Sequence, residues 1–145
     1  MEHPIRLKHA FILPLLAAAP AAMADPMDSA DAVIDALNQA GYADVRDVER
    51  DDGLWEAEVR GTDGRYRDLH IVPATGEILD PEGDTAVLTA DEIRARLEAE
   101  GYTNVKDLDL DEAVWEAEAD AADGTRVDLV INGFDGSVLD SEVDD

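Results

Sequence analysis

The fold is decided by the stretch WEAEVRGTDG, residues 55–64. Its first six residues alternate between apolar and charged side chains, which predicts a half-buried strand of an antiparallel sheet. The Asp63-Gly64 pair that follows is a strong signal for a tight hairpin turn. Beyond the turn, Leu69 and Ile71 predict the inward face of a second strand. We expect Trp55 to pack in the core rather than to stack on a ligand, because small apolar residues share its strand face.

The same pattern returns after sixty residues without a gap. The WEAE motif of residues 55–58 recurs at residues 115–118, and the Asp-Gly pair recurs at residues 123–124. The matches continue on both sides, with Gly-Tyr at 41 and 101, Asp-Leu at 68 and 128, and Leu-Asp at 79 and 139. Self-similarity at a fixed period indicates two tandem copies of one structural module.

Each copy begins with a helical pattern. In the second copy, Thr89 and Glu92 have the spacing of a capping box. Ile93 and Leu97 lie four residues apart and therefore share one helix face. Gly101 stands where a helix favours a left-handed residue after its last turn. The first copy has the same pattern, carried by Val33, Ile34, Leu37 and Gly41.

We therefore expect an α+β fold of two tandem modules, each with one helix packed on a three- to four-stranded antiparallel meander. An additional first strand is expected around Val48 and around Leu108–Leu110, and a short last strand at residues 78–79 and 138–139. Module 1 then spans residues 25–80, a linker spans 81–87, and module 2 with an acidic tail spans 88–145. Modules this small bury little apolar surface alone, so we expect the two to pack together.

The first 24 residues differ in kind from the rest. Arg6 and Lys8 precede an apolar run at residues 10–19, and an Ala-Met-Ala sequence ends at residue 24. This order is typical of a secretory signal peptide. The apolar run is too short to span a bilayer. We expect residues 1–24 to be a cleaved signal peptide, the protein to be periplasmic or secreted, and no stable membrane insertion after cleavage.

Composition and charge exclude several classes of function. The chain has 36 acidic and 11 basic residues, a net charge of −25, and no cysteine. Without thiols there is neither a disulfide framework nor cysteine chemistry. Few and scattered basic residues cannot form a phosphate-binding patch, so we expect no nucleic-acid partner.

The motifs, in their order, resemble the PepSY domain family. They are a helix ending in Gly-Tyr-x-x-Val, the WEAE strand, the Asp-Gly hairpin and the ATGEILD stretch of residues 74–80. The resemblance covers residues 28–141 in two copies. It implies that the chain restrains or regulates a peptidase outside the cytoplasm, as expected of domains found in propeptides of secreted metallopeptidases. The second copy departs from the pattern, with Asp135-Gly136 in place of Thr75-Gly76.

The sequence contains few histidines and no cysteine, residue types that act as nucleophiles, bases or zinc ligands in enzymes. After residue 24 the only histidine is His70, which alternation places on the strand face opposite Leu69 and Ile71. We expect His70 to be a solvated surface residue. One histidine and no cysteine supply neither a nucleophile–base pair nor a zinc site. We expect no enzymatic activity, no catalytic residue and no cofactor.

One acidic stretch matches part of a calcium-binding loop. Asp107, Asp109, Asp111 and Glu118 fall at positions 1, 3, 5 and 12 of an EF-hand loop. Glu112 stands at position 6, where that loop requires glycine. Leu108 and Leu110 alternate with these aspartates, so we favour a strand whose leucines face inward, and no metal site. A calcium site formed by the four acidic residues is the alternative.

The sequence and the resemblance leave two candidate functions. The first is an exported acidic protein-binding module whose partner is another protein, in the leading interpretation a peptidase that it restrains. The alternative is a calcium- or cation-binding acidic envelope protein without a protein target.

The net charge makes a first prediction. Cleavage after residue 24 removes one acidic and two basic residues, which changes the net charge from −25 to −26. Self-repulsion opposes the compact state, and salt screens it. The melting temperature of residues 25–145 should therefore rise between about 10 mM and about 1 M NaCl, as the Debye length falls from about 30 to about 3 Å. A flat or falling melting temperature would show that the charges are already compensated in the fold.

Overall fold

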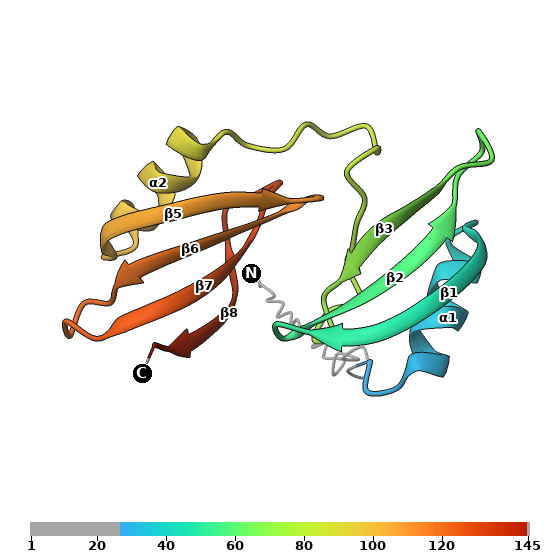
Figure 1. Cartoon of the computed structure of the whole chain (residues 1–145), viewed down its shortest axis with the longest axis horizontal. Coiled ribbons are helices and arrows are strands. Elements are labelled where there is room, and N and C mark those ends of the chain that lie inside the picture. The colour runs from blue at the N-terminus through green and yellow to red at the C-terminus, as the bar shows by residue number, and fades with distance from the viewer. Residues whose placement is uncertain (1–26, 145) are drawn as a thin grey trace, which may run out of the picture.

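The computed structural model describes residues 27–144, which form two modules of the same build (Figure 1). Module 1 contains α1 (Ala30–Gln39), β1 (Ala43–Asp51), β2 (Leu54–Arg60), β3 (Tyr66–Ile71) and β4 (Ile78–Leu79). Module 2 contains α2 (Ala90–Ala99), β5 (Thr103–Asp111), β6 (Val114–Asp120), β7 (Arg126–Asn132) and β8 (Val138–Val143). The predicted α+β fold is confirmed: each module is one helix packed against an antiparallel sheet, with strand orders β1-β2-β3-β4 and β5-β6-β7-β8.

Strand pairing repeats with the same register in both sheets. Trp55 lies opposite Ile71 in the first sheet, and Trp115 lies opposite Ile131 in the second. The hairpin turns are also equivalent, because Gly64 and Gly124 adopt left-handed φ angles of 84° and 88°. A tight turn that needs positive φ favours glycine, which confirms the Asp-Gly hairpin prediction.

The helix ends agree with the capping signals. The Thr89 side chain accepts a hydrogen bond from the Glu92 backbone N–H at 3.2 Å, and the Thr89 N–H donates to the Glu92 carboxylate at 2.8 Å. This reciprocal pair is the predicted capping box. After α1, the Tyr42 N–H donates to the Leu37 carbonyl, which turns the chain back over the helix end into β1.

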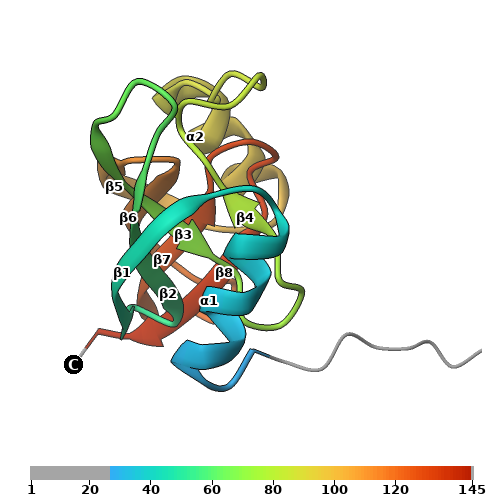
Figure 2. The same ribbon diagram turned by 90° about the vertical axis from the view of Figure 1, so that its right-hand side faces the viewer.

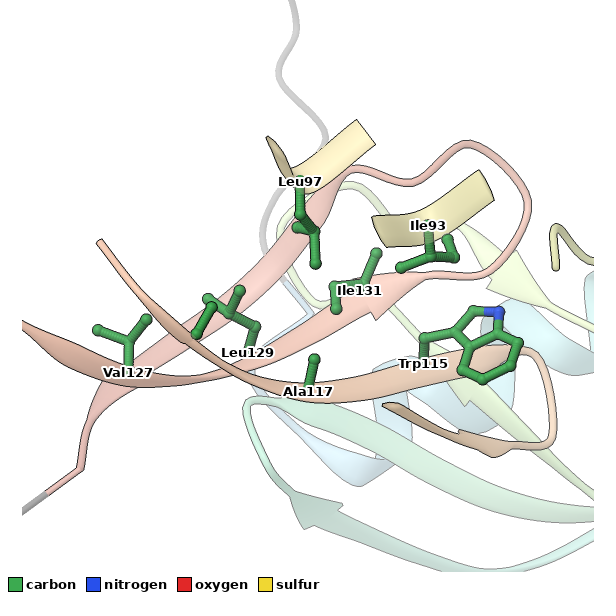
Figure 3. Packing of buried hydrophobic residues seen from close by; sticks show 8 residues of the cluster. Ile93, Leu97, Trp115, Ala117, Val127, Leu129 and Ile131 are labelled. Atoms are coloured by element: carbon green, nitrogen blue, oxygen red, sulfur yellow. The ribbon is translucent and has the colours of Figure 1, made fainter. Parts of the chain in front are cut away.

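Each helix covers one face of its own sheet and closes a small apolar core. In module 2, Ile93 and Leu97 of α2 point toward Trp115, Leu129 and Ile131 on the sheet (Figure 3). The Trp115 indole N–H donates to the Leu88 carbonyl at 2.9 Å, so its polar atom is satisfied inside the core. Trp55 and Trp115 are 7% and 9% exposed, which confirms core packing over ligand stacking.

The first strand of each module differs from strict alternation. Register shifts interrupt β5 on both sides of Lys106, and Asn104 and Asp107 have φ angles of 50° and 52°. These bulges place Val105 and Leu108 against the core, three residues apart. Leu110 is 49% exposed, so the expectation that both leucines face inward is wrong for Leu110. The bulges, which single-residue alternation does not predict, are the reason.

The last strand of module 2 is longer than expected. β8 continues to Val143, with Asp140 opposite Val130 and Glu142 opposite Asp128. The residues interpreted as the start of an acidic tail are therefore paired to β7. In module 1 the equivalent strand β4 has two residues, because Pro81 follows it closely and begins the connection to α2.

The two sheets pack through their helix-free faces, and α1 and α2 lie on the outer sides (Figures 1 and 2). We call the apolar contact between the sheets the seam. It is formed by Leu54, Val72, Leu79, Ala113, Val114 and Val130, with Val87, Phe134 and Leu139 packed against it. The seam confirms that the two small modules bury additional surface by packing together.

The predicted signal peptide, residues 1–24, lies outside the described residues. Among residues 27–144, no helix has the length and apolar character needed to cross a bilayer.

The core makes a second prediction. Replacing Trp115 with alanine should lower the free energy of unfolding by about 3–5 kcal/mol, as truncation of a large buried aromatic does. Urea denaturation measures this. Leu110→Ala is the control, because its exposed side chain should change stability by no more than about 0.5 kcal/mol. Equal effects of the two substitutions would contradict the placement of Trp115 in the core.

Candidate functional site

The candidate site is a cleft next to the seam, where the helix-free face of sheet 2 meets the turn between β1 and β2 of module 1. We call it the inter-module cleft. Its open part has a volume of about 260 Å³ and is lined mainly by carboxylates. They are Asp52, Asp107, Asp109, Glu116, Glu118, Asp128, Asp140 and Glu142. Seven of these eight lie on strands of module 2, and the packing of the modules adds Asp52 of module 1.

The turn between β1 and β2 closes one side of the cleft. Gly53 in this turn has a φ of 78°, and a Cβ atom there would lie 2.6 Å from the Asp140 carboxyl carbon. The positive φ favours glycine at position 53, and the Asp140 side chain of β8 packs close to it. The turn of module 1 thus reaches across to module 2 (Figure 1).

The cleft raises the pKa of several of its carboxyl groups. Burial is the largest cause for Asp52, Glu56 and Glu116, and also for Glu112 next to Asp111, and repulsion from neighbouring carboxylates adds to it. Asp111 contributes to this repulsion at all four groups. A surface crowded with one sign of charge attracts cations.

The inner end of the cleft holds the histidine. Glu56 of β2 and His70 of β3 are cross-strand neighbours on the helix-free face of sheet 1. The His70 Nε2 lies 3.7 Å from a Glu56 carboxylate oxygen and 3.5 Å from an Asp111 carboxylate oxygen at the end of β5. The three residues therefore converge from two modules on one point.

His70 is 5% exposed, so the expectation of a solvated surface histidine is wrong. Alternation correctly placed His70 on the face opposite Leu69 and Ile71, but that face packs against module 2 instead of facing solvent. Val130, the equivalent residue of module 2, is buried on the same seam. An apolar residue at this position of the other copy was the sequence signal for burial.

Equivalent residues of the two modules meet at this inner end. The small cavity there, of about 50 Å³, is lined by both members of four repeat pairs and by Asp52. The pairs are Asp51 and Asp111, Leu54 and Val114, Glu56 and Glu116, and His70 and Val130. The arrangement is reciprocal, as in an isologous dimer, but only one half carries a histidine.

The acidic residues of the calcium alternative are distributed between two places. Asp107, Asp109 and Glu118 line the open part of the cleft. Asp111 lies instead at the inner end, beside His70. The Glu118 carboxylate is held by Arg126 at 2.8 Å, and this hydrogen bond lowers its pKa. Sequence reasoning had not included Glu56, Asp52 or Glu116, which only the packing of the two sheets brings to the cleft.

A second polar cluster belongs to module 1 alone. The Arg67 guanidinium donates to both Asp80 carboxylate oxygens, at 3.1 and 2.7 Å, and the Tyr42 hydroxyl donates to the same carboxylate at 2.7 Å. Burial would raise the pKa of Asp80, but the hydrogen bonds from Arg67 and Tyr42 outweigh it and lower that pKa. Burial and Asp80 raise the pKa of Tyr42 to about 12. Val127 replaces Arg67 in module 2, so this cluster is not repeated there.

Comparison with known proteins identifies one family. The family model PepSY_2, described as "Peptidase propeptide and YPEB domain", matches residues 8–82 and again residues 83–142. The two matches support the interpretation of two tandem copies. No curated protein matches the chain.

The cleft carboxyl groups make a third prediction. Groups whose pKa is raised in the fold bind protons more readily in the folded than in the unfolded chain. The free energy of unfolding should therefore rise as the pH falls from neutral toward 4.5, the ordinary glutamate value. Below 3.8, the ordinary aspartate value, it should fall as Asp80 becomes protonated and its contribution is lost.

Urea denaturation at a series of pH values, with a chelator present, measures this profile. Glu56→Gln combined with Glu116→Gln should reduce the gain on mild acidification, because these substitutions remove two of the carboxyls whose pKa is raised. A steady loss of stability from neutral pH downward would contradict the mutual repulsion of these groups.

Proposed function

Because this chain belongs to the PepSY_2 family, we propose that it is an exported, non-catalytic protein that binds a peptidase outside the cytoplasm and restrains it. Domains of this family are associated with peptidase propeptides and with inhibition, and they are typically non-catalytic regulatory modules. They are usually extracytoplasmic. The observation that carries the proposal is the match of the family model to both modules.

The inter-module cleft supports a protein partner with a basic surface. Its eight lining carboxylates include Asp107, Asp109 and Asp128, which are exposed. A lysine or arginine side chain of a partner would neutralise several of them at once, and complementary charge increases association rates strongly. Salt should weaken such binding, because the interacting charges are in contact with solvent.

The cation-binding alternative is favoured by the same cleft, where Asp107, Asp109 and Glu118 lie together. Calcium prefers oxygen ligands, which these residues supply. The contact of Glu118 with Arg126 weighs against it, because that carboxylate is already neutralised. Calorimetric titration with Ca²⁺ separates the two functions: a tight stoichiometric site would favour the alternative, and its absence would favour a protein partner.

The protein-binding function makes a fourth prediction. The immobilised chain should capture a peptidase from the exported proteins of its own cell, and adding the chain should inhibit hydrolysis of a peptide substrate by that enzyme. The triple substitution Asp107→Asn, Asp109→Asn and Asp128→Asn should weaken inhibition by about 10-fold or more, since each lost charge contact to a partner is worth about 1 kcal/mol or more.

The matched control is Asp31→Asn, Asp35→Asn and Asp91→Asn. It removes the same charge from the exposed outer sides of α1 and α2. The control should leave inhibition within about 2-fold of the original chain, because its residues lie away from the cleft. Equal loss in the two variants would assign the effect to net charge alone, and failure to capture or inhibit any peptidase would contradict the proposed function.

A further inference from the structure

His70 is a buried imidazole, and neither ring nitrogen has a hydrogen bond to another residue in the described range 27–144. Its side chain is 7% exposed, and Nδ1 has no hydrogen-bond partner among residues 27–144. Its other nitrogen, Nε2, points to Glu56 and Asp111 at 3.7 and 3.5 Å, beyond the 2.7–3.2 Å range of N–H···O hydrogen bonds. The carboxylates at Nε2 are thus near enough to share a ligand with it but do not hydrogen-bond to it.

The separations between the side-chain atoms suit a metal ion better than direct hydrogen bonds. Zinc bonds to imidazole nitrogen and carboxylate oxygen at about 2.0–2.2 Å in tetrahedral geometry, which places neighbouring ligand atoms about 3.4 Å apart. The distances from Nε2 to the two carboxylates are 3.5 and 3.7 Å. One ligand atom from each of Glu56, His70 and Asp111 lies within 4.8 Å of the other two.

We propose that Glu56, His70 and Asp111 bind one divalent first-row transition-metal ion, with zinc as the best-fitting ion, between the two modules. Imidazole together with carboxylates favours such ions over calcium, which prefers oxygen ligands alone. The adjoining cavity of about 50 Å³ is large enough for a water molecule as a fourth ligand. This site is separate from the calcium alternative, with which it shares only Asp111.

The ion would link the modules. Glu56 and His70 come from β2 and β3 of module 1, and Asp111 comes from the end of β5 in module 2. Its positive charge would also offset the repulsion among the carboxylates that surround the inner end of the cleft. Metal binding to the folded chain alone should therefore raise its stability.

The reciprocal half of the cavity provides an internal control. Glu116, Val130 and Asp51 are the repeat equivalents of Glu56, His70 and Asp111, and they line the same cavity. They have the carboxylates but not the imidazole. A general attraction of cations to the cavity would involve both halves, whereas the proposed site requires only the half that contains His70.

Calorimetric titration of the chelator-treated full chain with ZnCl₂ tests the proposal. One high-affinity ion per chain is expected, and His70→Val should weaken its binding by at least about 10- to 100-fold, since loss of an outer-shell partner alone already costs that much. His3 and His9 are present in the original chain and in the His70→Val variant, so the difference in zinc affinity between them is due to His70. Valine is the residue of the other module at this position, and circular dichroism verifies folding.

Two further measurements make the result specific. Glu56→Gln should weaken zinc binding strongly, and Glu116→Gln should change it less than about 3-fold, although both remove one charge from the same cavity. On zinc addition, the ¹⁵N resonance of the His70 Nε2 should shift. Equal effects of the two glutamine substitutions, an unchanged His70 resonance, or calcium binding as tight as zinc binding would overturn the proposal.

Discussion

The structure depends on the apolar seam between the two sheets. Leu54, Val72 and Leu79 of module 1 are buried against Ala113, Val114 and Val130 of module 2. A module of this size buries too little surface in its own core to be robust alone, so this contact supplies a second core shared by both. Part of each helix-free face is therefore buried in this contact, and acidic residues beside it remain exposed.

The seam has an electrostatic cost that defines the functional surface. Next to it, carboxylates of both modules gather along the inter-module cleft, where burial and repulsion from neighbouring carboxylates raise the pKa of Glu56 and Glu116. Apolar burial at one end of the interface is thus coupled to unfavourable charge at the other. A basic side chain of a partner or a metal ion relieves the same repulsion, so protein binding and ion binding both follow from one physical constraint.

The two modules differ at positions outside their repeated cores, hairpins and strand register. The cores, the hairpins and the strand register are repeated, since each sheet must pack on its own helix. The Tyr42–Arg67–Asp80 cluster belongs to module 1 alone, because Val127 replaces Arg67. His70 faces its equivalent Val130 across the interface, which makes a reciprocal arrangement chemically asymmetric.

The sequence by itself determined the repeat, the α+β module, the capping box at Thr89 and the core positions of Trp55 and Trp115, because these depend on local periodicity and turn chemistry. The same local patterns predicted strict alternation at Leu110 and a solvated His70, and both were wrong. Only the tertiary structure decided these points, since bulges in β5 change the period and since contact between sheets depends on which faces meet. The convergence of Glu56, His70 and Asp111 follows from that contact, which brings together Glu56 and Asp111, 55 positions apart, and has no signature within either module.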